Sequence, residues 1–296
     1  MQADDMQTNG AATAAYYRPT DLAAALSIRA SQQVCIAAGC TDLFPATKNK
    51  ALTGPVLDIT AIPELRGVSV EPTGIRIGGA TTWSDLLAAD LPAAFDGLKL
   101  AASEIGSVQI QNAGTIAGNL CTASPAADGV PCLLTLDASV ELSSVNGTRL
   151  LPLDQFLLGP RQHALQSDDL LTAVLIPTSA CRGAGHFQKL GARKYLVISI
   201  AMVAVRLETE SGLIIRVAIS VGSCSPVAVR LPRLEETLTG QSLASAALLV
   251  RPDLIIPDLS PIDDIRADQD YRKTAAVELV RRALSELVSS AQQAAA

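Results

Sequence analysis

The stretch NAGTIAGNLCTASPAAD, residues 112–128, carries a single carboxylate, at Asp128, and is otherwise uncharged and rich in small residues. Glycines let a backbone approach a ligand closely, and consecutive N–H groups form an anion-binding concavity without cationic side chains. A second stretch, AAGCTDLFP at residues 37–45, has the same character. Two such loops predict a site that binds one long dinucleotide from both sides, in which Asp128 accepts hydrogen bonds from polyol hydroxyls.

A structural interpretation competes with this one. Gly39, Gly114 and Gly118 are typical of ordinary turns, and Asp128 stands where it would cap the helical segment expected after it. A single stretch of this kind favours the structural interpretation. Two stretches, each following an apolar segment, favour the dinucleotide site.

Composition excludes several classes of protein. The chain has 296 residues, enough for two domains, and an apolar content of 49%, too high for a disordered chain. Its net charge of −6, with no basic block, argues against a nucleic-acid partner. The longest strongly apolar run, at 195–205, is too short to span a membrane. Residues 1–15 are polar and predict a disordered lead rather than a signal peptide.

Other chemistries lack the residues they need. The two histidines, His163 and His186, stand in no zinc-binding pattern, and the chain has no GK[ST] phosphate loop and no G-x-S-x-G elbow. GTIAGN is not the G-x-G-x-x-G of a Rossmann site. Six cysteines lie scattered without a CxxC pair or ferredoxin-like spacing, which indicates reduced thiols in the cytoplasm and no iron–sulfur cluster in this chain.

Secondary structure changes character near residue 180. Before that point the pattern predicts a helix at 20–30, a capping box at Thr82 and Asp85, and a hairpin at Asn146-Gly147. It also predicts a buried helical turn at 129–138. After residue 180 we expect three successive strands, at 183–191, 195–208 and 212–223, and then helices, among them one at 271–290. This is an α+β pattern, with the domain boundary at 177–183.

Three segments together resemble a known family. AAGCTDLFP, NAGTIAGNLCTASPAAD and FQKLGARK (187–194) are similar, in this order, to motifs of the FAD-binding subunit of molybdenum hydroxylases. That family includes the flavoproteins of xanthine dehydrogenase and carbon monoxide dehydrogenase. The resemblance runs from about Tyr17 to the 271–290 segment and includes RLPRLEETLTGQSL (230–243) and DIRADQDYRKTAAVELVRRAL (264–284).

The resemblance implies a fold and a set of cofactor-binding residues. It implies two α/β subdomains that cradle FAD at 16–180, and a C-terminal α+β domain, a three-stranded sheet plus helices, at 181–296. The implied site consists of two loops and four further residues: Ala37, Ala38, Gly39, Cys40, Thr41, Asp42, Leu43 and Phe44; Thr115, Ile116, Ala117, Gly118 and Asn119; and Ile105, Asp128, Leu171 and Lys189. Without the resemblance, Lys189 before a glycine would be interpreted as a solvated lysine. On the same strand, Phe187 and His186 are candidates to approach the flavin ring.

Three departures from the family pattern stand in the motifs. Ala38-Gly39-Cys40 replaces A-G-G, and Gln111-Asn112 replaces an Arg-Asn pair. Ala117 stands where the family has glycine, so its φ is expected to be negative. The Cys40 thiol is expected to be buried and inert.

The implied function is electron transfer. The resemblance implies a heterotrimer, itself paired into a dimer, in which a large subunit with a molybdopterin cofactor hydroxylates the substrate. A small subunit with two [2Fe-2S] clusters passes electrons to FAD, and FAD passes them to NAD, a quinone or oxygen. GARKYLVISIAMVAV (191–205) is closer to the purine and N-heterocycle branch. The alternatives are a non-enzymatic dinucleotide-binding module and a stand-alone flavin oxidoreductase with covalent flavin, attached at Cys40 or Cys121.

Overall fold

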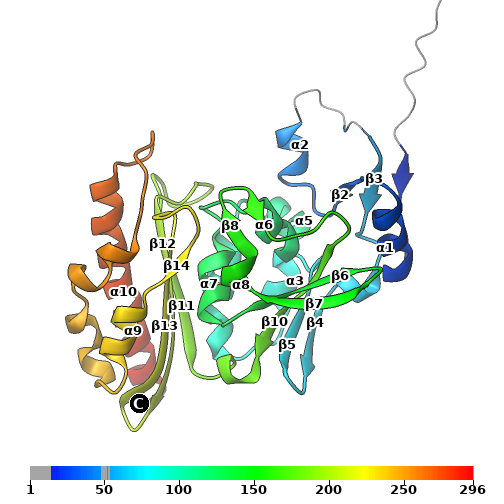
Figure 1. The fold of residues 1–296 in the computed structure, drawn as a ribbon. Helices are drawn as coiled ribbons and strands as arrows, with labels where there is room; N and C mark the ends of the chain where they lie inside the picture. The colour runs from blue at the N-terminus through cyan, green and yellow to red at the C-terminus, as the bar shows by residue number, and fades with distance from the viewer. Residues whose placement is uncertain (1–14, 48–51, 53, 296) are drawn as a thin grey trace, which may run out of the picture.

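The computed structural model describes residues 15–47, 52 and 54–295, and the lead expected at 1–15 lies almost entirely outside them. The N-terminal half forms two subdomains, and the C-terminal part adds a sheet flanked by a long helix (Figure 1). Among the described residues, no helix has the length and apolar character needed to cross a membrane.

The first subdomain is built on a small parallel sheet in the order β1-β3-β2. Its elements are β1 (Tyr16–Tyr17), α1 (Leu22–Ser31), β2 (Cys35–Ala37), α2 (Leu43–Ala46), β3 (Val56–Asp58) and a 3-10 turn η1 (Pro63–Leu65). Helix α1 begins after Asp21, whose carboxylate accepts a hydrogen bond from the Ala24 amide at 2.8 Å. This cap satisfies one of the amides that the first turn of a helix leaves unpaired.

The second subdomain is built on an antiparallel sheet in the order β4-β5-β10-β6-β7. Its strands are β4 (Val68–Glu71), β5 (Gly74–Gly78), β6 (Ser139–Ser144), β7 (Gly147–Pro152) and β10 (Leu170–Pro177), with a separate pair β8 (Leu157–Gly159) and β9 (Gln162–His163). Its helices are α3 (Trp83–Ala88), η2 (Ala93–Phe95), α4 (Asp96–Glu104), α5 (Val108–Ala113), α6 (Ile116–Thr122), α7 (Gly129–Thr135), α8 (Leu153–Phe156) and η3 (Thr178–Ala180).

Two local signals in this subdomain form as the sequence predicts. Thr82 and Asp85 make both bonds of a capping box at the start of α3. The hairpin of β6 and β7 also forms, although its loop is Val145 and Asn146, and Gly147 already pairs with Ser144.

The C-terminal domain contains a four-stranded antiparallel sheet rather than three strands, because a short strand pairs with the last of those expected. Its elements are β11 (Ala184–Leu190), β12 (Ala201–Glu210), β13 (Leu213–Gly222), β14 (Val229–Arg230), α9 (Pro232–Leu238), η4 (Leu243–Leu249), η5 (Pro252–Leu254), η6 (Ile256–Asp258) and α10 (Gln269–Ala295). The strand predicted at 195–208 starts only at Ala201. Arg193 bonds the carbonyls of Tyr195 and Leu196, and Leu196 has a left-handed backbone (φ 52°), so this segment is a loop.

The C-terminal sheet is covered on both faces, as Figure 1 shows for α7 on one side and α10 on the other. Along β12, Met202 and Ala204 join the core of the second subdomain, whereas Val203 and Val205 join the core formed with α10. A strand buried on both faces is apolar at every position rather than at alternate ones. This explains the part of the apolar run that lies in the strand, residues 201–205.

Helix α7 is buried along its whole length, and two arginines of the C-terminal domain hold its C-terminal end. Arg206 Nε donates to the Thr135 carbonyl at 2.6 Å, and Arg230 Nη1 donates to the Leu134 carbonyl at 2.9 Å. Both guanidinium groups also contact Asp137, at 3.2 and 3.0 Å. Cations at this end satisfy carbonyls that a helix leaves unpaired and complement its dipole.

Candidate functional site

The two glycine-containing loops lie in direct contact although they are far apart in sequence. A Cβ on Gly39 would lie 1.9 Å from the Ala113 carbonyl oxygen, so the two backbones touch at this point. Thr122 Oγ1, on α6, donates to Asp42 Oδ2 at 3.0 Å across 80 residues of sequence. The structure therefore brings together the two stretches that the sequence singled out.

The first loop presents a run of unpaired backbone donors. None of the four amides of Gly39, Cys40, Thr41 and Asp42 donates a hydrogen bond to another described residue. Cys40 has a left-handed backbone, with φ 56°, which turns successive N–H groups toward one side. Unpaired amides in a turn of this kind form an anion-binding concavity.

The second stretch differs from the expectation, because its amides are already used inside the protein. The N–H groups of Ile116 and Ala117 donate to the carbonyls of Thr81 and Gly79, each at 3.0 Å, and that of Gly118 donates to Thr115 Oγ1 at 3.1 Å. These bonds satisfy the first turn of α6, which begins after Thr115. Ala117 lies in that helix with negative φ, so its departure from glycine causes no strain.

Asn119 follows on α6 and is a polar residue of the second stretch whose side-chain oxygen is not paired with another described residue. Its Oδ1 is buried and has no hydrogen-bond partner among the described residues. A Cβ on Gly129 would lie 3.2 Å from this oxygen, so the amide group lies beside the start of α7. An unsatisfied buried amide is costly unless a ligand or water completes it. Together with the free amides of the first loop, Asn119 fits a polar, anionic dinucleotide.

Asp128 precedes α7 but makes no capping bond, so the capping interpretation is wrong. Its Oδ2 accepts from Lys189 Nζ at 2.6 Å and its Oδ1 from Ser199 Oγ at 2.6 Å. The side chains of Lys189 and Asp128 are only 8% and 7% exposed, so Lys189 is not a solvated lysine either. Burial raises the pKa of Asp128, whereas the Lys189 charge and both hydrogen bonds oppose that rise.

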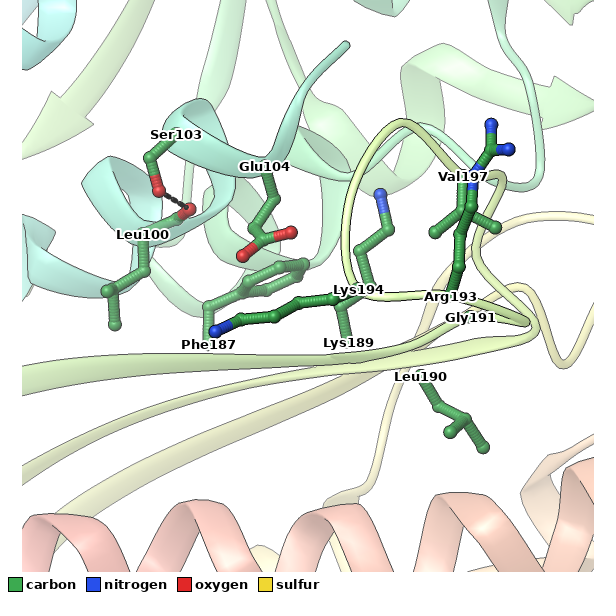
Figure 2. Close-up of a pocket in the computed structure, with 10 residues that line it drawn as sticks. All are labelled: Leu100, Ser103, Glu104, Phe187, Lys189, Leu190, Gly191, Arg193, Lys194 and Val197. Carbon is green, nitrogen blue, oxygen red and sulfur yellow. Dashed lines mark hydrogen bonds between the residues drawn. The ribbon is translucent and has the colours of Figure 1, made fainter. Parts of the chain in front are cut away.

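A cavity of about 410 Å³ opens between the end of α4 and the segment after β11. Figure 2 shows Phe187 and Lys189 of β11 on one side of it, with Ser103 and Glu104 of α4 opposite. The loop 191–197 closes another side with Arg193, Lys194 and Val197. Leu190 points to the opposite face of the strand, toward α10.

Strand alternation separates the two residues of β11 that were candidates to approach the flavin ring. Phe187 lines the cavity and packs into the core of the second subdomain. His186 does not line the cavity. Burial lowers its pKa, and the nearby charge is that of Glu286 on α10.

The remaining expected residues lie on three parts of the fold. Ile105 ends α4 directly after Glu104 and packs on the core beside the cavity. Leu171 lies in β10, and its carbonyl oxygen would be 2.5 Å from a Cβ on Gly79. The residues of the first stretch run from the end of β2 into α2: Ala37, Ala38, Gly39, Cys40, Thr41, Asp42, Leu43 and Phe44.

Sequence reasoning missed two residues that shape this region. Gly79 lies where α6 meets β10, since a Cβ there would also be 3.2 Å from Ala117 Cβ. The consecutive glycines Gly78 and Gly79 are the signal in the sequence that could have indicated it. Ser199 reaches Asp128 across 71 residues, and nothing in its own sequence neighbourhood indicates that contact.

Two family models match consecutive parts of the chain. The FAD binding domain in molybdopterin dehydrogenase matches residues 9–179, and the CO dehydrogenase flavoprotein C-terminal domain matches residues 186–287. The first match alone covers more than half of the chain.

Relatives and a solved structure agree with these models. The chain is 30% identical to the xanthine dehydrogenase FAD-binding subunit of Escherichia coli O157:H7, over 94% of this chain and 97% of that protein. It is 36% identical to the nicotinate dehydrogenase FAD-subunit of Eubacterium barkeri, over 70% of this chain and 72% of that protein. The structure of carbon monoxide dehydrogenase from Hydrogenophaga pseudoflava matches with a TM-score of 0.82 and 28% identity, over 92% of this chain and 96% of that chain. The family and the α+β fold inferred from the sequence are thereby confirmed, and the chain belongs to the FAD-binding flavoprotein subunits of molybdopterin dehydrogenases, which are oxidoreductases.

Proposed function

We propose that this chain is the FAD-carrying electron-transfer subunit of a heterotrimeric molybdenum hydroxylase. It takes electrons from the [2Fe-2S] clusters of a small subunit and passes them to an external acceptor, while a large molybdopterin subunit hydroxylates the substrate. The observation that supports this best is the run of free amides at Gly39, Cys40, Thr41 and Asp42, which contacts the second stretch.

The residues of this chain supply binding and orientation. We assign the first-loop amides to the diphosphate, and Asn119 and Asp128 to polyol or ribose hydroxyls. Lys189 and Ile105 belong beside the flavin ring, and the Leu171 backbone beside the adenine. When bound, FAD supplies the chemistry of accepting electrons one at a time and releasing them as a pair. Phe187 and the loop 191–197 line one side of the cavity.

The wider assembly follows the same proposal. We place the chain in a dimer of heterotrimers, with NAD, a quinone or oxygen as the acceptor, and with a purine or other N-heterocycle as the substrate of the complex. Relatives named for nicotinate, nicotine and caffeine support the substrate class. Six free cysteines support a cytoplasmic location. We divide the chain at residue 180 into an FAD-binding domain and a C-terminal flavoprotein domain.

A covalent flavin oxidoreductase is the less favoured alternative. Burial raises the pKa of the Cys121 thiol to about 12 and also raises the pKa of Cys40. Thiolate formation at either position is therefore suppressed, and an attachment through sulfur is disfavoured.

Flavin content of the purified full chain tests the proposal. We expect about one FAD per chain, released by acid precipitation, and a titration of the apo-protein in which FMN binds much more weakly than FAD. FMN lacks the second phosphate and the adenosine of FAD, so it would make only part of the contacts assigned to the first-loop amides and the Leu171 backbone. Equal affinity for FMN and FAD would contradict the two-loop site, and flavin retained in the acid pellet would favour the covalent alternative. Co-purification from the native host identifies the partner subunits.

A further inference from the structure

Ser199 connects the loop 191–199 to the candidate FAD site without lining the cavity. Its side chain is buried, and its hydroxyl donates to Asp128 Oδ1 at 2.6 Å. The other carboxylate oxygen of Asp128 holds the Lys189 ammonium at 2.6 Å. The carboxylate is thus fixed on one side by Ser199, and on the other side it fixes Lys189 at the cavity wall.

Arg272, near the start of α10, holds the backbone next to Ser199. Its Nη1 donates to the Ile200 carbonyl and, at 3.0 Å, to the Ser223 carbonyl, and its side chain is only 3% exposed. Its Nη2 pairs with Asp264 Oδ1 at 2.7 Å. A buried guanidinium with three partners thus holds the backbone just before β12, next to Ser199.

Torsion about the Asp Cβ–Cγ bond is broad, so a buried carboxylate keeps one orientation only where hydrogen bonds define it. We propose that Ser199 and Arg272 are positioning residues that orient Asp128 and thereby hold the Lys189 ammonium at one place in the cavity wall. The inference rests on the proposed function, since the effect of that ammonium is exerted on FAD. A fixed positive charge beside the ring favours the reduced, more negative cofactor and raises its midpoint potential.

Replacement of Ser199 by Ala in the full chain tests this role. Without the hydroxyl, Asp128 is free to turn and Lys189 loses its fixed position. We expect the FAD dissociation constant to rise about tenfold and the flavin midpoint potential to fall. Ser220→Ala is the matched control, because Ser220 is an equally buried serine, on β13, whose hydroxyl bonds the Val229 carbonyl instead. Ser220→Ala should leave both quantities unchanged.

A double-mutant cycle separates positioning from general stability. In a Lys189→Met background, Ser199→Ala should change the FAD dissociation constant by less than twofold and should leave the midpoint potential unchanged within error. The reason is that the ammonium through which Ser199 acts is gone. Arg272→Lys keeps the charge but not the fork of donors, and should shift both quantities in the same direction as Ser199→Ala. If Ser199→Ala does not fold, Arg272→Lys takes its place in the cycle.

The outcomes are distinguishable. An undiminished effect of Ser199→Ala in the Lys189→Met background overturns the inference, and so does a loss of apo-protein stability with FAD affinity and potential unchanged. In both cases wild-type FAD binding persists and the proposed function stands. Failure of the wild-type chain to bind FAD would overturn the proposed function and the inference together.

Discussion

Gly39 and Ala113 are so close that a Cβ on Gly39 would lie 1.9 Å from the Ala113 carbonyl oxygen. The φ of Gly39 is not positive, so the reason for glycine here is contact between the two loops rather than an unusual backbone conformation. Any side chain at this position would push apart the two stretches that form the candidate FAD site.

Gly39→Ala is therefore expected to abolish flavin retention. It should also lower the free energy of unfolding by about 1–3 kcal/mol, the usual cost of placing extra atoms in a packed interior. Flavin absorbance after gel filtration and chemical denaturation measure the two effects. Gly159→Ala is the control, because a Cβ there meets only the flexible Gln162 side chain, no closer than 3.4 Å. Normal flavin content in Gly39→Ala would show that the loop contact is dispensable.

The Lys189–Asp128 pair predicts a non-additive effect on stability. Lys189→Met or Asp128→Leu alone leaves a buried charge without its partner and should cost about 3–5 kcal/mol in the apo-protein. The double variant should recover most of that loss, because it removes both charges. FAD affinity should not recover with it. Denaturation and FAD titration of all four proteins check this, and additive losses in stability would mean that the two groups are not coupled.

Two substitutions of Asp128 test its contribution to FAD binding. Asp128→Asn keeps a hydrogen-bond acceptor for Ser199, whereas Asp128→Ala keeps none, so FAD affinity should fall roughly ten- to a hundredfold for Ala and less for Asn. Titration of each apo-protein with FAD measures the difference. Equal affinities for wild type and Asp128→Ala would remove Asp128 from the site.

Arg206 should stabilise the contact between the two domains through the end of α7. Arg206→Met leaves the Thr135 carbonyl without its charged donor, and we expect a loss of about 1.5–3 kcal/mol in the free energy of unfolding. Arg216→Met, which removes an exposed arginine that bonds the Ser179 carbonyl, should cost no more than about 0.5 kcal/mol. Comparable losses for the two variants would contradict the role of Arg206.

Asp264 predicts a dependence of stability on acid pH. Burial would raise its pKa, but hydrogen bonds from the Arg266 amide, Arg272 and the Ala267 amide outweigh it and lower that pKa to about 2. A carboxyl with a lowered folded-state pKa contributes stability above its unfolded value of 3.8 and loses it as the pH falls toward 2. The difference in unfolding free energy between wild type and Asp264→Asn should therefore shrink from pH 5 to about pH 2. A constant difference across that range would contradict the assignment.

The features of the fold that could be predicted from the sequence are those set by residues close together in the chain. The capping box of Thr82 and Asp85 and the hairpin at Asn146 depend on residues a few positions apart, and both formed. The apolar pattern predicts a strand from residue 195, but residues 195–200 form a loop, in which Arg193 bonds the carbonyls of Tyr195 and Leu196.

The geometry of the site depends on contacts that no local pattern encodes. Lys189 and Ser199 reach Asp128 across 61 and 71 residues, so the buried pair that Asp128 forms has no signal in the sequence around it. The glycine motifs predict a site built from backbone amides. Only the fold shows that the carbonyls of Thr81 and Gly79 already accept hydrogen bonds from amides of the second stretch.

The C-terminal sheet is covered by α7 on one face and by α10 on the other, so the two domains share buried apolar surface. Neither half can be expressed alone without exposing an extended apolar surface, either the outer side of α4 and α7 or the inner face of the sheet. We therefore expect the two halves to unfold together, so that an FAD site assembled from both is lost in one step.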